Sequence, residues 1–201
     1  MNLVKITLTS LFSLTLLMSA CSSGNSSTNN AKAESENTEE KTPVVKVKIQ
    51  SDVLNQPYDQ YLLLKDALFN NNIDLVKNSA KDMKSAFAQV DAKNIPASLN
   101  EQWSELNKTC NEELSKIEQC SKVTDARLSF SALSDAFSDA VKVFGLKKGK
   151  AYLQHCPMAK NAKGSEGADW LDKDEAIANP YFGAKDEMKG CGETKESYTF
   201  E

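Results

Sequence analysis

Apolar residues recur at three- and four-residue spacing between residues 52 and 145. That spacing puts apolar side chains on one face of an α-helix, so it favours amphipathic helices over strands. The pattern is interrupted at residues 70–72, 94–96 and 119–122, where Asn, Pro and polar residues gather. The sequence therefore predicts four helices joined by short connections. Their expected inner faces include Tyr58, Tyr61, Leu68, Val76, Met83, Phe87, Trp103, Cys110, Leu114, Leu128, Phe130, Phe137 and Phe144.

The simplest architecture for four such helices is an antiparallel bundle. We expect an all-α fold, with the bundle over residues 51–146 and a loop-rich C-terminal tail over 147–201 packed on it as part of the same domain. Aromatic and Met side chains at helical spacing are interpreted as core. Val45, Val47 and Ile49 alternate with lysines, which fits either a short edge strand or the end of a flexible segment.

The first residues resemble a secretion signal. Lys5 precedes an apolar run from Ile6 to Met18, and Ser19-Ala20-Cys21 follows. The run is shorter than the roughly 20 residues that span a bilayer, so residues 1–20 are predicted to be a removed signal peptide. Met18 to Cys21 resembles the bacterial lipobox, which predicts that Cys21 carries the lipid. The alternative is an ordinary signal peptide that leaves Cys21 as a free thiol.

Residues 21–50 are predicted to form a flexible tether behind the lipidated cysteine. Residues 22–42 are rich in Ser, Asn, Thr, Glu, Ala and Lys and lack aromatic side chains, so they have too little apolar surface to fold by themselves. Acyl chains on Cys21 would hold the chain at a membrane without a spanning helix. We expect a lipid-anchored protein of the cell envelope that faces the periplasm or the cell exterior.

Charge and motifs exclude two broad classes of function. The chain has a formal charge of −4 and no basic patch in its sequence, so no nucleic-acid partner is expected. Its one His residue, His155, is not accompanied by a Gly-x-Ser-x-Gly elbow, a phosphate-binding loop or paired catalytic acids. The sequence therefore predicts no enzyme activity.

Soft donor atoms gather in the predicted tail. Cys156 and Met158 are separated only by Pro157, and Met188 precedes Cys191 by one helical turn. Thiolate and thioether sulfurs select Cu(I) over hard ions such as Mg²⁺. The sequence therefore predicts a soft-metal site for copper(I), with Cys156, Met158, Met188 and Cys191 as ligands and His155 as a further donor.

The same segment resembles a known bacterial family. The residues concerned are His155-Cys156-Pro157-Met158-Ala159, Trp170-Leu171, Asn179-Pro180-Tyr181-Phe182-Gly183, Met188 and Cys191-Gly192. They resemble a family of uncharacterised helical domains that occur as envelope lipoproteins and as a module on the periplasmic adaptor subunits of copper/silver efflux pumps. The resemblance extends from Tyr58 to Glu193. It implies a metal-handling role and, as a partner, an efflux adaptor or another envelope protein.

A competing interpretation needs no metal. Cys156 and Cys191 can form a disulfide that fixes the tail to the bundle, which an oxidising compartment favours. The thiol and disulfide forms exclude each other at any instant, although a redox switch can connect them. The protein would then be a structural or interaction lipoprotein. Arg127, near the start of the fourth predicted helix, either pairs with an acid, caps the tail or lies on the surface.

Overall fold

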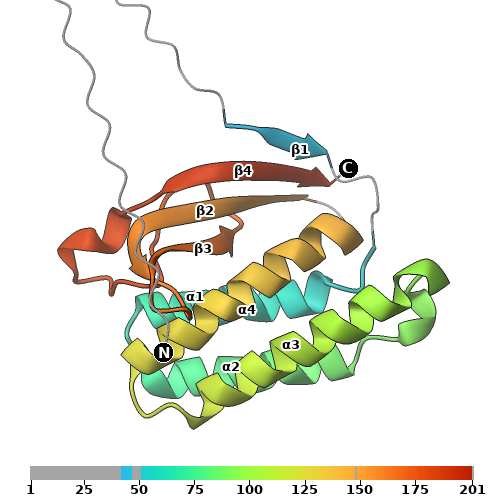
Figure 1. Cartoon of the computed structure of the whole chain (residues 1–201), viewed down its shortest axis with the longest axis horizontal. Helices are drawn as coiled ribbons and strands as arrows, with labels where there is room; N and C mark the ends of the chain where they lie inside the picture. Colours follow the sequence, from blue (N-terminus) through green and yellow to red (C-terminus); the bar gives the residue numbers. More distant parts are fainter. Residues whose placement is uncertain (1–41, 47–50, 148, 201) are drawn as a thin grey trace, which may run out of the picture. The chain divides into compact units, whose positions relative to one another are not determined.

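The structure is a computed structural model, and it describes residues 42–46, 51–147 and 149–200 (Figure 1). The predicted signal peptide over residues 1–20, the lipidation site Cys21 and most of the tether lie outside the described residues. The described residues belong to one compact unit. In chain order it contains a short strand, four α-helices, two antiparallel strands and a last strand, with 3-10 turns between them.

The four helices lie within the predicted range. Asn72, in the first predicted interruption, caps the second helix by accepting a hydrogen bond from Leu75 N at 3.1 Å. Gly145 ends the fourth helix with a φ of 69°, a conformation that favours glycine. The helices are α1 (Asn55–Phe69), α2 (Ile73–Ala88), α3 (Asn100–Gln119) and α4 (Val123–Phe144).

The core of the helical layer is aromatic. Tyr61 of α1 stacks on Phe130 and Phe137 of α4, with ring centroids 5.2 Å apart in both pairs. Trp103 of α3 packs edge-on against Phe144 at 5.6 Å. These are residues of the predicted inner faces, and all five are buried. Burial of such rings supplies both apolar area and favourable ring contacts, so it fixes how the helices meet.

The expectation of an all-α fold is wrong, because the predicted tail is largely β-sheet. The strands are β1 (Val44–Lys46), β2 (Gly149–Lys160), β3 (Glu166–Asp172) and β4 (Glu193–Phe200). They form one sheet in the order β1-β4-β2-β3, in which β2 runs antiparallel to both neighbours and β1 runs parallel to β4. The chain therefore has an α+β fold. The edge-strand alternative holds for the described part of its stretch, Val44 to Lys46.

The strands β2 and β4 were not predicted because their sequences lack the usual strand pattern. A half-buried strand is recognised by strict alternation of apolar and polar residues, usually with β-branched side chains. In β2 both Leu153 and Gln154 are buried, where the pairing with β4 shifts register, so the alternation breaks at its centre. In β4 only Tyr198 and Phe200 are buried, which leaves too few apolar positions for a clear pattern.

The sheet covers one side of the helical layer, with α1 and α4 next to it and α2 and α3 beyond (Figure 1). Tyr61 links the layers, because its hydroxyl lies 2.7 Å from Ser134 Oγ of α4 and accepts from Leu171 N of β3 at 3.1 Å. Among the described residues, no helix has the length and apolar character needed to cross a membrane.

Candidate functional site

Cys156 and Cys191 are joined by a disulfide. Cys156 is completely buried in β2, opposite Ala168 of β3, whereas Cys191 is partly exposed where the long β3–β4 connection reaches β4. Their Cα atoms lie 5.8 Å apart although 35 positions separate them in sequence. In this form neither sulfur is a free thiolate. The fold nevertheless brings two of the four predicted sulfur donors, those of the cysteines, to one point.

The connection that carries Cys191 is held by Asn179. Its side-chain amide donates to the carbonyl oxygen of Cys191 at 2.6 Å, and its side-chain oxygen accepts from Tyr181 N at 2.9 Å. Its own backbone N–H donates to Lys189 O at 3.0 Å. Asn179 is fully buried, so these bonds form away from water, where leaving them unmade costs about 1–3 kcal/mol each. They hold the backbone of Cys191 by contacts that do not involve the disulfide.

Arg127 anchors the same connection to the helices, which is the capping role considered from the sequence. Its guanidinium donates to the carbonyl oxygen of Pro180 at 2.8 Å, to that of Leu68 at 3.1 Å and to Asn71 Oδ1 at 2.8 Å. Burial lowers the pKa of Arg127 from its usual value. Ala184 N adds a bond of 2.7 Å to Phe69 O at the end of α1.

Aromatic packing completes the attachment. Tyr181 lies against Phe130 of α4 at 5.9 Å and against Trp170 of β3 at 6.0 Å, and its hydroxyl donates to Asp169 O. Burial raises the pKa of Tyr181 well above its usual value. Trp170 lies on the same face of the sheet as Cys156, because it follows Ala168, the residue opposite Cys156, by two positions.

Gly192 follows Cys191 and has to be glycine. Its φ is +140°, and a Cβ there would lie 2.8 Å from the carbonyl oxygen of His155 and 2.9 Å from the Trp170 ring. Both distances are shorter than real Cβ contacts allow. The backbone beside Cys191 is therefore pressed directly against β2 and Trp170, which keeps Cys191 beside Cys156.

The two methionines of the predicted site flank the disulfide in the chain and differ in exposure. Met158 follows Cys156 by two positions in β2, in the register shift between the Cys156 and Lys160 pairs with β3, and is 59% exposed. Met188 is partly exposed in the 3-10 turn η3 (Glu187–Gly190), and its carbonyl oxygen accepts from Cys191 N at 2.9 Å. This turn keeps Met188 within one turn of Cys191, as the spacing predicted.

His155 belongs to a different face. It precedes Cys156 in β2, and successive side chains of a strand point to opposite sides of the sheet. Its Nδ1–H donates to Asp169 Oδ1, and Asp169 Oδ2 accepts from Lys195 Nζ at 2.9 Å. The structure therefore brings together Cys156 and Cys191, with Met188 and Met158 nearby in the chain, and places His155 in a separate ionic cluster.

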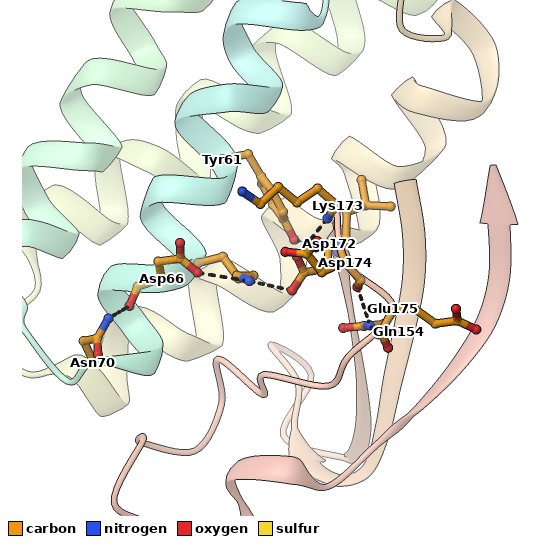
Figure 2. Close-up of polar contacts among 10 residues, drawn as sticks. Tyr61, Asp66, Asn70, Gln154, Asp172, Lys173, Asp174 and Glu175 are labelled. Carbon is orange, nitrogen blue, oxygen red and sulfur yellow. Dashed lines mark hydrogen bonds and ion pairs between the residues drawn. The ribbon is translucent and has the colours of Figure 1, made fainter. Parts of the chain in front are cut away.

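The sequence did not single out a buried ion pair between the layers. Lys65 of α1 hydrogen-bonds Asp172 at the end of β3 and lies 3.0 Å from Asp66 Oδ1 (Figure 2). Figure 2 also shows Gln154 directed at the chain after β3, where its amide donates to the carbonyl oxygens of Asp174 and Glu175, each at 3.1 Å. The sequence could have indicated this pair only if Asp172 had been expected to be buried. Because β3 was not predicted, its burial was not expected either.

The other two described cysteines are unpaired. Cys110 is buried inside α3, and burial raises the pKa of its thiol to about 12. Cys120 is partly exposed at the end of α3. Within the described part of the chain, no three His, Cys, Asp or Glu side chains are arranged to hold a metal ion. Methionine, which supplies two of the five predicted ligands, is not among those four residue types.

One comparison with known proteins gave a match. A family described as "Protein of unknown function (DUF3347)" matches residues 58–149. The matched region runs from α1 to the first residue of β2, so it covers the helical layer and stops before Cys156. Neither the search of curated proteins nor the search of solved structures found a match.

Proposed function

We propose that this chain is a lipid-anchored protein of the cell envelope that binds Cu(I) through the reduced Cys156 and Cys191 thiols. The thioethers of Met158 and Met188 are the additional ligands. The observation that carries the proposal is the meeting of two cysteines 35 positions apart, each with a methionine within three residues of it. His155 is left out of this ligand set because it points to the opposite face of the sheet and hydrogen-bonds Asp169.

The donor chemistry suits copper(I). A thiolate, rather than a disulfide sulfur, is the strong ligand, and soft sulfur donors prefer Cu(I) to harder cations. Reduction of the disulfide therefore has to precede binding. Asn179, Arg127 and Gly192 hold the Cys191 segment beside β2 by contacts that reduction leaves intact. The two thiols are thus expected to remain neighbours, which lowers the ordering cost of binding.

The cellular setting of the proposal follows from the sequence alone. A lipid on Cys21 would hold the protein at a membrane, facing the periplasm or the cell exterior, and the tether would let the domain reach neighbouring proteins. In that setting, bound Cu(I) is either sequestered or delivered to an efflux system through its adaptor or another envelope protein. The resemblance around Cys156 and Cys191 supports this choice of partner.

A Cu(I) titration tests the proposal. The mature chain with Cys21→Ser is titrated without oxygen against a competing chromophoric chelator, first reduced and then with its disulfide intact. We expect one Cu(I) per reduced chain and none for the disulfide form. Cys156→Ser and Cys191→Ser should abolish competition, whereas Cys120→Ser, which changes a free cysteine outside the site, should leave it unchanged. Failure of the reduced parent to compete would refute the proposal.

A second candidate function rests on the disulfide itself. If the cysteines stay oxidised in the envelope, the bond and the contacts of Asn179 and Arg127 make the connection a rigid structural part of an interaction domain without metal. A free-thiol count on protein isolated from the envelope separates the two candidates. Blocked sulfurs at Cys156 and Cys191 under all growth conditions would favour this second candidate, and a fraction with free thiols at both positions favours the first.

A further inference from the structure

The two sulfurs of the disulfide differ in how they can be reached. Cys156 is 0% exposed; it pairs with Ala168 of β3 on one side, and the pairing of β2 with β4 on the other side ends one residue earlier, at His155. Cys191 is partly exposed and follows the 3-10 turn η3, in which Lys189 and Gly190 are exposed. A Cβ added to Gly190 would meet no atom within 4 Å, so the space next to that residue is open. An external reagent therefore meets Cys191 first.

Disulfides are opened by in-line attack of a thiolate on one of the two sulfurs, and access decides which sulfur is attacked. We infer that Cys191 is the sulfur that an external dithiol reductant attacks, and that Cys191 is thereby the site of the mixed disulfide that links this protein to its reductant. The inference deepens the proposed function, since it names the class of partner that would convert the disulfide form into the metal-binding form.

The exchange balances with a dithiol as the source of electrons. A thiolate of the reductant attacks Cys191 Sγ, the Cys156–Cys191 bond breaks, and its electron pair leaves with Cys156 Sγ, which takes up a proton. The second thiol of the reductant then attacks the reductant's first sulfur, which is bonded to Cys191 Sγ in the mixed disulfide, and Cys191 leaves as a thiolate. The protein gains two electrons and the dithiol becomes a disulfide.

The structure also explains why the intermediate would form without unfolding. The carbonyl oxygen of Cys191 stays bonded to the Asn179 amide, and Gly192 keeps its backbone pressed against β2. Only the side chain of Cys191 has to rotate when it accepts the external sulfur. Attack on Cys156 would instead require local opening around a fully buried side chain, so it would be limited to rare opened states.

Chemical trapping with glutathione tests the inference. The mature chain with Cys21→Ser and Cys120→Ser is oxidised, exposed briefly to glutathione, quenched with acid and alkylated with N-ethylmaleimide. Peptide mass spectrometry then locates each label. At the earliest times we expect glutathione on Cys191 and N-ethylmaleimide on Cys156, with about a tenfold excess over the opposite arrangement because buried sulfurs react slowly.

Glutathione mainly on Cys156, or equally on both sulfurs, would overturn the inference. A second measurement adds Cys156→Ser or Cys191→Ser, so that one thiol of the pair remains in addition to the buried Cys110, and reacts each variant with glutathione disulfide; the Cys191 thiol should react faster than the Cys156 thiol by a similar factor. If the variants do not fold, the trapping of the parent protein decides alone. Neither measurement contains copper. The inference about Cys191 can therefore be refuted while Cu(I) binding is confirmed, and Cu(I) binding can be refuted while the inference is confirmed.

Discussion

Reduction of the Cys156–Cys191 disulfide should weaken the fold without undoing it. The bond closes a loop of 35 positions that contains the whole β3–β4 connection. Loop closure restricts the unfolded chain, and a reductant removes that restriction without changing a side chain. Asn179 and Arg127 hold the same connection independently, so the native arrangement should persist in the reduced state.

The magnitude follows from the size of the loop. In the chain-entropy model, closing 35 residues lowers the entropy of the unfolded chain enough to stabilise the native state by about 4 kcal/mol at 25 °C. Domains of this size have a free energy of unfolding of roughly 5–15 kcal/mol, so the reduced protein should remain folded at room temperature. Its urea midpoint should fall accordingly.

The assay follows Trp170, whose ring lies against Gly192 beside Cys191. The variant Trp103→Phe leaves Trp170 as the fluorescent indole of the domain. Urea unfolding of this variant is recorded by fluorescence and by circular dichroism, with and without a phosphine reductant. We expect reduction to leave the Trp170 emission at zero urea almost unchanged. Fluorescence and circular dichroism should then report one cooperative unfolding transition, at a lower urea concentration than in the oxidised protein.

Two results would refute this reasoning. If reduction shifts the Trp170 emission to that of a solvated indole at zero urea while the helical signal is kept, the connection depends on the disulfide and the contacts of Asn179 and Arg127 are too weak to hold it. If the free energy of unfolding changes by less than about 1 kcal/mol, the loop is not closed by this bond in solution.

Three further predictions concern single side chains. Arg127→Met should lower the free energy of unfolding by about 2 kcal/mol more than Arg127→Lys, because it leaves partly buried carbonyl acceptors without a donor; thermal unfolding of both variants measures the difference. Gly192→Ala should cost more than about 2 kcal/mol in urea unfolding, whereas Gly190→Ala, which has open space, should stay within about 0.5 kcal/mol, and equal effects would contradict the packing. Iodoacetamide at pH 9 should modify Cys120 and spare Cys110, whose thiol stays protonated because burial raises its pKa to about 12; modification of Cys110 in the native state, read by mass spectrometry, would contradict its burial.

The helical layer was predictable because its signal is long. Each helix presents several turns of apolar residues, and polar or proline-containing interruptions separate them. The fourth helix also ends at Gly145, whose φ of 69° is a backbone conformation that glycine adopts more easily than other residues. Local information of this kind is sufficient to locate helices, although it says nothing about what covers them.

The sheet was not predictable in the same way, because its stability comes from partners distant in sequence. β2 gains its neighbours only when β3 and the C-terminal β4 fold back on it. The buried positions of β2 include Ala151 and Gln154, which carry little strand preference by themselves. The periodicity therefore indicated correctly that the helices end, and the interpretation of what followed as a loop-rich tail was wrong.

For the candidate site, too, the residue types could be recognised from the sequence, whereas their arrangement depended on the fold. The chemistry of Cys156, Met158, Met188 and Cys191 could be recognised from residue types, and the possible pairing of the two cysteines could be stated beside it. The position of His155 could not be settled, because in a loop His155 and Cys156 can face one ion, whereas in a strand they point to opposite sides. The anchoring role of Asn179 likewise depends on a fold that brings Lys189 and Cys191 around it.

We predict that Cu(I) binds to the reduced Cys156 and Cys191 pair with sulfur ligands alone. X-ray absorption at the copper edge of the reduced, copper-loaded mature chain tests it most directly, with His155→Ala as the control variant. We predict a Cu(I) edge and a first shell of sulfur scatterers without nitrogen, unchanged in His155→Ala and lost in Cys191→Ser. A nitrogen scatterer that disappears in His155→Ala, or copper that is not retained by the reduced chain, would contradict the account.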